Sequence, residues 1–227
     1  MVVLGVRAAH MHDAKRRVDR RLARAGGRAT ADQIDQLVEY LLLLERWNAR
    51  MNLTALDDPD SAVDRLIVEP VLASAAVDPE ARSLVDIGSG GGSPSLPLKI
   101  CRPDLSLTMI EVKTRKSVFL REVVRHLGLL ACTVETARFE QVLAKPSVKG
   151  SVDVVSVRAV RADVEQLRLF GEALRPGGQQ LWFLSGQQSV PLLPAPLTVE
   201  REIPLVEPLR SRLLIVRKSA EARSAGS

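Results

Sequence analysis

Aromatic residues and cysteines are scarce in this sequence. Aromatic side chains make up 3% of the 227 residues, and both tryptophans, Trp47 and Trp182, stand in apolar surroundings that favour the core. Stacking of bases on surface aromatics, the usual means of binding single-stranded RNA, is therefore not expected. The two cysteines, Cys101 and Cys132, form no Cys-x-x-Cys pair, so we predict buried free thiols, no metal centre and a reducing compartment.

Long hydrophobic runs are absent as well. No apolar run approaches the roughly 18 residues that cross a membrane, and VVLGV near the start is too short for the core of a signal peptide. We therefore expect a cytoplasmic protein without membrane contact. Residues 1–28 are rich in arginine and poor in acids, which loosely resembles a mitochondrial transit peptide.

The remaining composition is that of a globular protein with a basic surface. Hydrophobic residues make up 46% and charged residues 26%, and the net charge is +5. This charge is compatible with an anionic partner such as nucleic acid, and equally with a plain basic enzyme surface. The length suits one α/β domain with an appendage, or two small domains.

The first 80 residues predict helices. Lysine and arginine dominate residues 1–28, which we interpret either as an arm for RNA phosphates or as a solvated, partly mobile terminus with a short helix ending at Gly26. Thr30 and Gln33 have the spacing of a capping box, and the apolar stripe after them predicts a helix that ends near residues 48–52. DDPDSAV starts a further helical stretch, which runs to about Val77.

From Ser83 onward, β-rich runs alternate with helical patterns. SLVDI, LTMIE, ACTVE, VDVVSV and QQLWFL indicate strands, and LTVEREIPL and SRLLIVRK indicate an antiparallel pair. The alternation predicts an α/β fold, a mostly parallel seven-stranded sheet with helices on both faces. We assign a basic arm to residues 1–28, a helical extension to 29–80, an α/β domain to 81–218 and a flexible tail to 219–227, with 29–218 as one compact unit.

A glycine-rich turn, in the stretch LVDIGSGGGSPSLPLKI, follows the first predicted strand. In open α/β sheets, ligands bind beyond the carboxyl ends of the strands, and glycine lets a ligand approach the backbone. A P-loop is excluded because no lysine follows the glycines directly, and the dinucleotide pattern Gly-x-Gly-x-x-Gly is broken by Ser93. The spacing from Asp86 to Gly92 fits Asp/Glu-x-Gly-x-Gly-x-Gly, a pattern that seats S-adenosylmethionine.

A second acid supports a nucleotide-like ligand. Glu111 ends the next predicted strand, where a carboxylate can accept both hydroxyl groups of a ribose. NAD would use the same acid, so Glu111 fits S-adenosylmethionine and NAD alike. A surface glutamate at a strand end is the alternative interpretation.

Several motifs together resemble one family. LLLLERWNARMNLTALDDP, VDIGSGGGSPSLPLKICRPDLSLTMIE, RKSVFLREVVRHLGL, ARFEQV, DVVSVRAV and LRPGGQQLWFLSG run from about residue 37 to 186 in the family's order. In these stretches the sequence resembles the bacterial small-subunit rRNA guanine-N7 methyltransferases, also called glucose-inhibited division protein B. The resemblance implies a class I, Rossmann-like methyltransferase domain after an N-terminal helical extension, S-adenosylmethionine as cofactor, 16S rRNA of the small ribosomal subunit as substrate, and a monomeric enzyme.

The motifs and the resemblance together imply the site residues. No general base is expected, because guanine N7 already carries a lone pair that can attack a methyl group, so the enzyme has only to position the reactants. Cofactor contacts are expected from Asp86, Gly88, Ser89, Gly90, Gly92, Ser93, Glu111, Val112, Lys113, Phe139, Glu140 and Arg158. Substrate contacts are expected from Asn52, Arg65, Arg115, Lys116, Arg158 and Ser185, with Arg50 as a further candidate for RNA phosphates.

The chain departs from the family on the substrate side. Arg-His-Phe-x-Asp-Ser-Leu is replaced by RLIVEPV, with Leu66 for histidine and Pro70 for serine, and the lysine of a late Leu-Lys-Gly is Ser185. In the turn, Ser93 and Ser95 stand where relatives favour phenylalanine and glycine. Other hypotheses are therefore a divergent methyltransferase with another substrate, a non-catalytic RNA-binding or ribosome-assembly protein with this fold and, more distantly, an NAD-dependent oxidoreductase.

Overall fold

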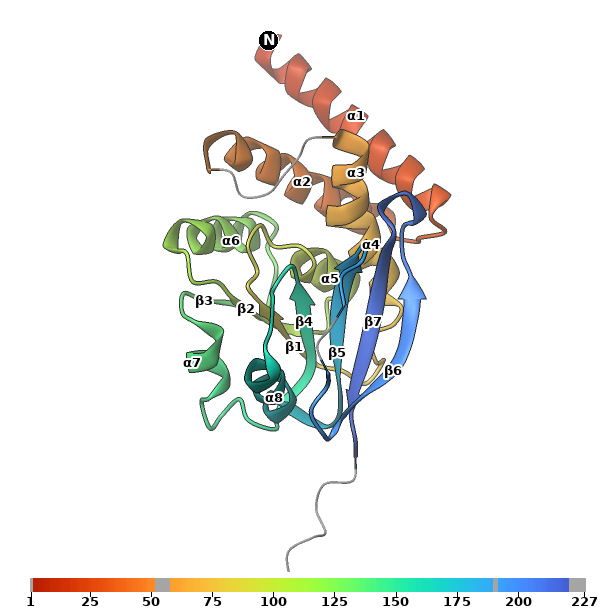
Figure 1. Ribbon diagram of the computed structural model, residues 1–227. Helices are drawn as coiled ribbons and strands as arrows, with labels where there is room; N and C mark the ends of the chain where they lie inside the picture. Colours follow the sequence, from red (N-terminus) through yellow and green to blue (C-terminus); the bar gives the residue numbers. More distant parts are fainter. Residues whose placement is uncertain (1, 52–57, 190–191, 221–227) are drawn as a thin grey trace, which may run out of the picture.

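A seven-stranded sheet forms the centre of the molecule in the computed structural model, which describes residues 2–51, 58–189 and 192–220 (Figure 1). The strands lie in the order β3-β2-β1-β4-β5-β7-β6; β1 to β5 pair in parallel, whereas β7 is antiparallel to both β5 and β6. Their bounds are β1 Ser83–Ile87, β2 Ser106–Ile110, β3 Cys132–Glu135, β4 Val152–Arg158, β5 Leu174–Ser185, β6 Leu197–Pro204 and β7 Ser211–Lys218. The predicted α/β sheet and its closing antiparallel pair are confirmed.

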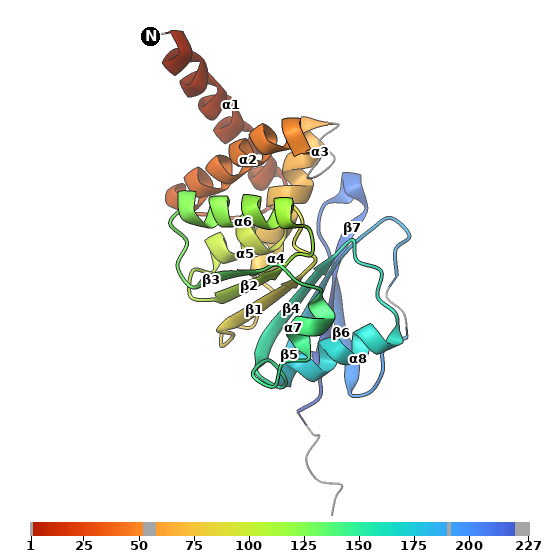
Figure 2. The same ribbon diagram turned by 90° about the vertical axis from the view of Figure 1, so that its left-hand side faces the viewer.

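Helices cover both faces of the sheet. Helices α5 (Ser95–Cys101) and α6 (Thr114–His126) lie on one face with the helical extension, and α7 (Phe139–Leu143) and α8 (Val164–Ala173) lie on the other (Figure 2). Successive residues of β1 therefore enter two separate cores: Leu84 packs on the first face, Val85 on the second. Burial on both faces explains why the parallel strands are almost continuously apolar in sequence.

The helical extension consists of α1 (Val2–Arg24), α2 (Ala31–Met51), α3 (Pro59–Val63), the π-helical turn η1 (Asp64–Val68) and α4 (Glu69–Ser74). The capping box predicted before α2 is confirmed, since Gln33 Oε1 accepts from the Thr30 backbone N–H at 2.8 Å and Thr30 Oγ1 accepts from the Gln33 backbone N–H at 3.2 Å. Asp58 caps α3 in a similar way by accepting from the Ser61 N–H at 2.8 Å. The helical stretch predicted to reach Val77 ends at Ser74 and contains the π turn.

The basic N-terminal segment differs from the short helix that we expected. It forms one continuous helix, α1, whose Ala14, Val18 and Leu22 are buried against the rest of the extension. The start of α1 points away from the sheet in both views (Figures 1 and 2). Arg21 forms two hydrogen bonds with Asp64 of η1, one of them 2.7 Å long, so part of the positive charge of α1 is already paired within the protein.

The extension also contacts the glycine-rich turn after β1. Tyr40 of α2 is completely buried, and its hydroxyl group donates to the carbonyl oxygen of Gly91 at 2.7 Å. On the same helix Trp47 packs against Phe119 of α6, with ring centroids 5.5 Å apart. The extension and the α/β domain therefore share one hydrophobic core.

Smaller features complete the fold. A 3-10 turn, η2 (Glu207–Leu209), lies between β6 and β7. Cys101 and Cys132 are free thiols, as predicted, but they are partly rather than completely buried. Burial raises the pKa of Cys101 to about 11. Among the described residues, no helix combines the length and apolar character needed to cross a membrane, and no cluster of His, Cys, Asp and Glu is arranged to hold a metal ion.

Candidate active site

A cavity of about 650 Å³ lies at the carboxyl ends of β1, β2, β4 and β5. The turn after β1 and the residues after β2 form one side, and η1 with the start of α4 forms another. Parallel strands end at the same edge of a sheet, and their loops leave a crevice there where the strand order reverses, here between β1 and β4. The topology thus places the cavity where α/β proteins bind their ligands.

The glycine-rich turn is sterically dependent on glycine. Gly92 has φ of +92°, a region that side chains other than glycine rarely adopt. A Cβ atom at this position would lie 2.3 Å from Leu96 Cδ1, far inside van der Waals contact. Gly92 itself does not line the cavity. Its role in the structure is to let the turn fold tightly over α5, with Gly88 and Gly90 at the cavity surface.

Asp86 lies beneath this turn rather than in the cavity. Its side chain is buried, with Oδ1 accepting from Ser156 Oγ at 2.6 Å and Oδ2 accepting from Ser95 Oγ at 2.7 Å. Burial raises the pKa of Asp86, and the hydrogen bonds from Ser156 and Ser95 oppose the shift. In the structure the carboxylate ties β1 to β4 and to α5, and the direct contact with a ligand stays a prediction.

Glu111 has the position predicted for it at the end of β2. Its carboxylate lines the cavity, accepting from the Gly90 N–H through Oε2 at 2.9 Å and from the Lys113 N–H through Oε1 at 2.8 Å. These two backbone donors fix the orientation of the carboxylate. A carboxylate has about four acceptor sites, so Glu111 can still accept from two further hydroxyl groups.

Arg158, at the end of β4, carries a positive charge into the cavity. Its guanidinium lies over the ring of Phe183, 4.5 Å from the centroid, and its Nη2 lies 2.8 Å from Oε2 of Glu69. Nη1 donates to the carbonyl oxygen of Arg65 and, at 3.4 Å, to Ser93 Oγ. Burial lowers the pKa of Arg158, and the charge of Glu69 opposes this shift. The buried Nε atom has no hydrogen-bond partner among the described residues.

The structure brings most of the predicted residues together around this cavity. Those that line it are Gly88, Ser89, Gly90, Ser93, Glu111, Val112, Lys113, Arg158, Arg65, Lys116 and Ser185. Sequence reasoning missed other lining residues, above all Glu69, Phe183 and Gln188. The position of Glu69 in a motif shared with relatives was the one available indication, but a lone glutamate in a helical stretch has no distinctive spacing.

Phe139 and Glu140 do not line this cavity. Both begin α7 on the opposite face of the sheet, where Phe139 packs on Phe170 with centroids 5.4 Å apart and Glu140 Oε1 accepts from Gln166 Nε2 at 3.1 Å. Their contact with the adenine of the cofactor stays a prediction. Glu140 instead borders a second, smaller hollow of about 400 Å³ between α7 and α8.

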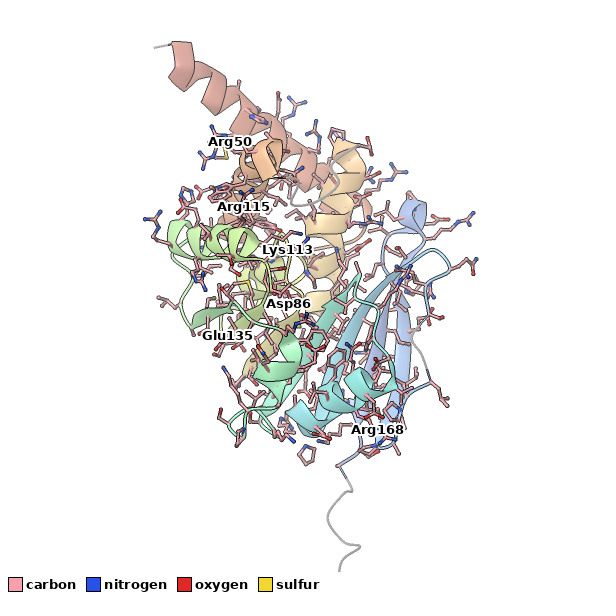
Figure 3. All side chains as sticks on the ribbon, turned by 60° about the vertical axis from the view of Figure 1, so that its left-hand side comes forward. Arg50, Asp86, Lys113, Arg115, Glu135 and Arg168 are labelled. Carbon is pink, nitrogen blue, oxygen red and sulfur yellow. The ribbon has the colours of Figure 1, made fainter. Side chains whose placement is uncertain are left out.

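Basic side chains lie above the cavity. Arg50 at the end of α2, Arg115 at the start of α6 and Lys113 follow one another toward Asp86 in the side-chain view, whereas Arg168 lies at the far end of the molecule (Figure 3). Arg50 and Arg115 are exposed and do not line the cavity. Asn52, the remaining predicted substrate residue, lies outside the described residues.

Comparison with known protein families gives a match over most of the chain. A family model described as rRNA small subunit methyltransferase G matches residues 33–191, a span that includes nearly all of α2, the glycine-rich turn and all the cavity residues. Proteins named ribosomal RNA small subunit methyltransferase G are similar over most of the chain. That of Roseiflexus sp. strain RS-1 is 39% identical, covering 70% of this chain and 71% of the relative, and that of Sorangium cellulosum is 35% identical, covering 88% and 86%.

Solved structures with low sequence identity share the fold. An S-adenosylmethionine-dependent methyltransferase from Aquifex aeolicus has a TM-score of 0.55 and 16% identity, covering 73% of this chain and 96% of that chain. A mutant of MtNAS in complex with S-adenosylmethionine has a TM-score of 0.57 and 13% identity, covering 82% of this chain and 78% of that chain. At these identities the likeness concerns the arrangement of helices and strands.

The tight fit around Gly92 gives a stability prediction. Gly92→Ala adds a methyl group against Leu96 at a positive φ, whereas Gly26→Ala, our control, adds one at φ of +71° with no atom within 4 Å. We expect Gly26→Ala to lower the free energy of unfolding by about 1 kcal/mol and Gly92→Ala to lower it by a further 1–3 kcal/mol, roughly the cost of overpacking. Urea unfolding followed by circular dichroism measures both, and equal losses would contradict the steric argument.

Proposed function

The chain belongs to the rRNA small subunit methyltransferase G family, and from that premise we propose that it transfers a methyl group from S-adenosylmethionine to N7 of a guanine in 16S rRNA. Family membership makes it an S-adenosylmethionine-dependent rRNA methyltransferase. The observation that carries the proposal is the single cavity in which the glycine-rich turn and Glu111 face the basic residues Arg65 and Arg158. We further propose that the enzyme acts in the cytoplasm as a monomer.

The residues around the cavity fit S-adenosylmethionine. Gly88 and Gly90 leave backbone exposed at the cavity surface, and Glu111 keeps two acceptor sites for the hydroxyl groups of a ribose. Arg158 lines the same cavity, and its positive charge suits an acceptor oxygen of a ligand. Val112 and Lys113 complete the cavity beside Glu111. When bound, the cofactor supplies an electrophilic methyl group on a positively charged sulfur.

The chemistry requires positioning and no proton transfer. Guanine N7 carries a lone pair that forms the new N–C bond directly, while the electron pair of the broken S–C bond stays with sulfur. No proton has to leave N7, so a general base has no task. The residues of the cavity hold the two reactants in line, which converts an encounter of two molecules into a step between fixed neighbours.

The basic residues above the cavity are suited to RNA phosphates. Arg65, Lys113 and Lys116 border the cavity, and Arg115 and Arg50 continue the positive charge toward α2. Phosphate contacts from arginine and lysine position RNA without reading its sequence. Because aromatic residues make up only 3% of the chain, we propose that charge and the shape of the assembled small subunit guide binding.

A second candidate function is methylation of another RNA. It is favoured by the substrate side of the cavity, where apolar Leu66 stands in place of the family's histidine and Ser185 in place of its lysine. The side chain of Ser185 is engaged locally, since Gln188 Oε1 accepts from its Oγ at 3.2 Å. Both changes remove a side chain that could form hydrogen bonds with a base. The following experiment distinguishes the two candidate functions.

Methyl transfer to purified small ribosomal subunits tests the proposed function. We expect label from S-adenosylmethionine to enter 16S rRNA of subunits prepared from cells that lack this gene, and to appear as 7-methylguanosine after digestion and mass analysis. Label in a different nucleoside or a different RNA would replace the proposal with the second candidate. Failure to bind the cofactor in calorimetry would favour a non-catalytic RNA-binding protein.

The contact proposed for Glu111 predicts a specific loss of cofactor affinity. Glu111→Gln keeps the size of the side chain but removes its charge, and we expect the Kd for S-adenosylmethionine to rise about 10- to 100-fold. The matched control is Glu135→Gln at the end of the neighbouring strand β3, whose carboxylate pairs with Lys145 outside the cavity. Calorimetry with both variants gives the result, and equal Kd values for Glu111→Gln and Glu135→Gln would refute the contact.

The proposed RNA surface predicts a salt-dependent effect of Arg115. We expect Arg115→Ala to raise the KM for small subunits about tenfold, to leave the Kd for S-adenosylmethionine unchanged, and to reduce the slope of log KM against log salt by about 0.7–0.9 per lost phosphate contact. Arg168→Ala, an exposed arginine on α8, is the control and should behave as wild type. If Arg168→Ala changes the KM and slope as much as Arg115→Ala does, the surface is placed incorrectly.

A further inference from the structure

Glu69 is a buried acid at the cavity to which neither the motifs nor the resemblance gives a role. It is the first residue of α4 and belongs to the helical extension, yet it lines the cavity with Arg65 and Leu66 of η1. Arg65 and Leu66 lie four and three residues before Glu69, so all three side chains lie on the same side of this helical segment. The side chain of Glu69 is only 5% exposed, and its Oε2 lies 2.8 Å from Nη2 of Arg158.

The pairing of Glu69 with Arg158 is not explained by stability. Removing two charges from water costs free energy that their attraction often fails to recover, so a buried ion pair is weak evidence for a stabilising role. Burial raises the pKa of Glu69 and lowers that of Arg158, and each group opposes the shift of the other. An ion pair at a cavity surface that does not stabilise the fold suggests a functional role for the pair.

The contacts of Arg158 define one orientation of its guanidinium. Glu69 lies at one edge, the ring of Phe183 lies against the face, and the carbonyl oxygen of Arg65 accepts from Nη1. Nη2 faces the carboxylate of Glu69, and only the buried Nε has no partner among the described residues. Arg158 lines the cavity, so a guanidinium held in this orientation presents its charge to an acceptor oxygen of a bound ligand.

We propose that Glu69 is a positioning residue for methyl transfer, acting through Arg158. It holds the guanidinium on Phe183 so that the positive charge of Arg158, at the cavity wall, meets an acceptor oxygen of a molecule bound in the cavity. That oxygen belongs either to the carboxylate of S-adenosylmethionine or to the carbonyl group of the target guanine. This inference rests on the proposed function and adds to it that the helical extension contributes a working part of the site.

A purely structural role for Glu69 is the competing explanation, and the chain offers a matched control for it. Asp64 lies five residues earlier in the same segment, and its side chain is 3% exposed. It pairs with Arg21 of α1 through two hydrogen bonds and does not line the cavity. Asp64→Asn therefore disrupts a similarly buried ion pair of the extension without touching the site.

The experiment compares Glu69→Gln, Glu69→Asp and Asp64→Asn in the full chain. Thermal unfolding, the calorimetric Kd for S-adenosylmethionine, and kcat and KM on small subunits are measured for each variant. We expect Glu69→Gln to lower kcat/KM by about 10- to 100-fold and Glu69→Asp, which keeps the charge, to recover part of that loss. Asp64→Asn should lower Tm to a similar extent and leave kcat/KM within about twofold of wild type.

The separate measurements identify the acceptor and test the inference. A raised Kd for S-adenosylmethionine in Glu69→Gln assigns the acceptor to the cofactor, and an unchanged Kd with a lower kcat or higher KM assigns it to the guanine. Wild-type kinetics in Glu69→Gln, or an equal kinetic loss in Asp64→Asn at an equal loss of Tm, would overturn the role of Glu69. If Glu69→Gln does not fold, Glu69→Asp decides in the same way, and unchanged kinetics in that variant would overturn it.

Failure of the proposed function is recognisable separately. Wild-type protein that binds S-adenosylmethionine but methylates no small subunit shows that the proposed substrate is wrong. In that case Glu69 is judged on the Kd for S-adenosylmethionine alone, and an unchanged Kd in Glu69→Gln would overturn the inference.

Discussion

The site depends on the fixed backbone of the glycine-rich turn, which is held between helices α2 and α5. From one side α2 fixes it, because the buried Tyr40 hydroxyl donates to the Gly91 carbonyl oxygen and Leu44 packs against the same residue. From the other side α5 leaves no room beyond a hydrogen atom at Gly92. A turn fixed in this way presents Gly88 and Gly90 at a constant position, and the helical extension is therefore part of the site's construction.

Buried charges support this turn in two different ways. Asp86 lies below it and accepts from two serine hydroxyls, so its charge is compensated by neutral donors that no ligand displaces. Arg158 lies beside the cavity, and its charge is compensated by Glu69 at Nη2, while Nη1 donates to the carbonyl oxygen of Arg65. Asp86 is closed off from the cavity, whereas Arg158 faces it. This difference separates a supporting acid from a side chain placed for binding.

The sequence predicted the elements of the sheet far better than the contacts of single side chains. The strands, the Thr30 capping box and the antiparallel pair could be predicted because each depends on a local sequence pattern, and the structure confirms them. Glu111 could be placed because a strand end has a fixed position in an α/β sheet. The burial of Asp86 could not be predicted, because the side chain of an acid in such a motif can lie beneath the backbone of the turn or beside the ligand. Glu69 was missed because its partner lies 89 positions away, on β4.

The departures from the family are connected in space, which bears on how such a site changes in evolution. Ser93, where relatives favour phenylalanine, donates through Oγ to the carbonyl oxygen of Leu66 at 3.0 Å. Leu66 in turn replaces the family's histidine and is buried beside the cavity. The acceptor is a backbone carbonyl that any residue at position 66 supplies, so this hydrogen bond depends on the serine and not on Leu66. The two side chains nevertheless line the cavity together with Arg158, and substitutions at neighbouring positions are expected to be energetically coupled. Both therefore belong to one part of the site, the substrate side, while Glu111 and the glycine backbone form the cofactor side.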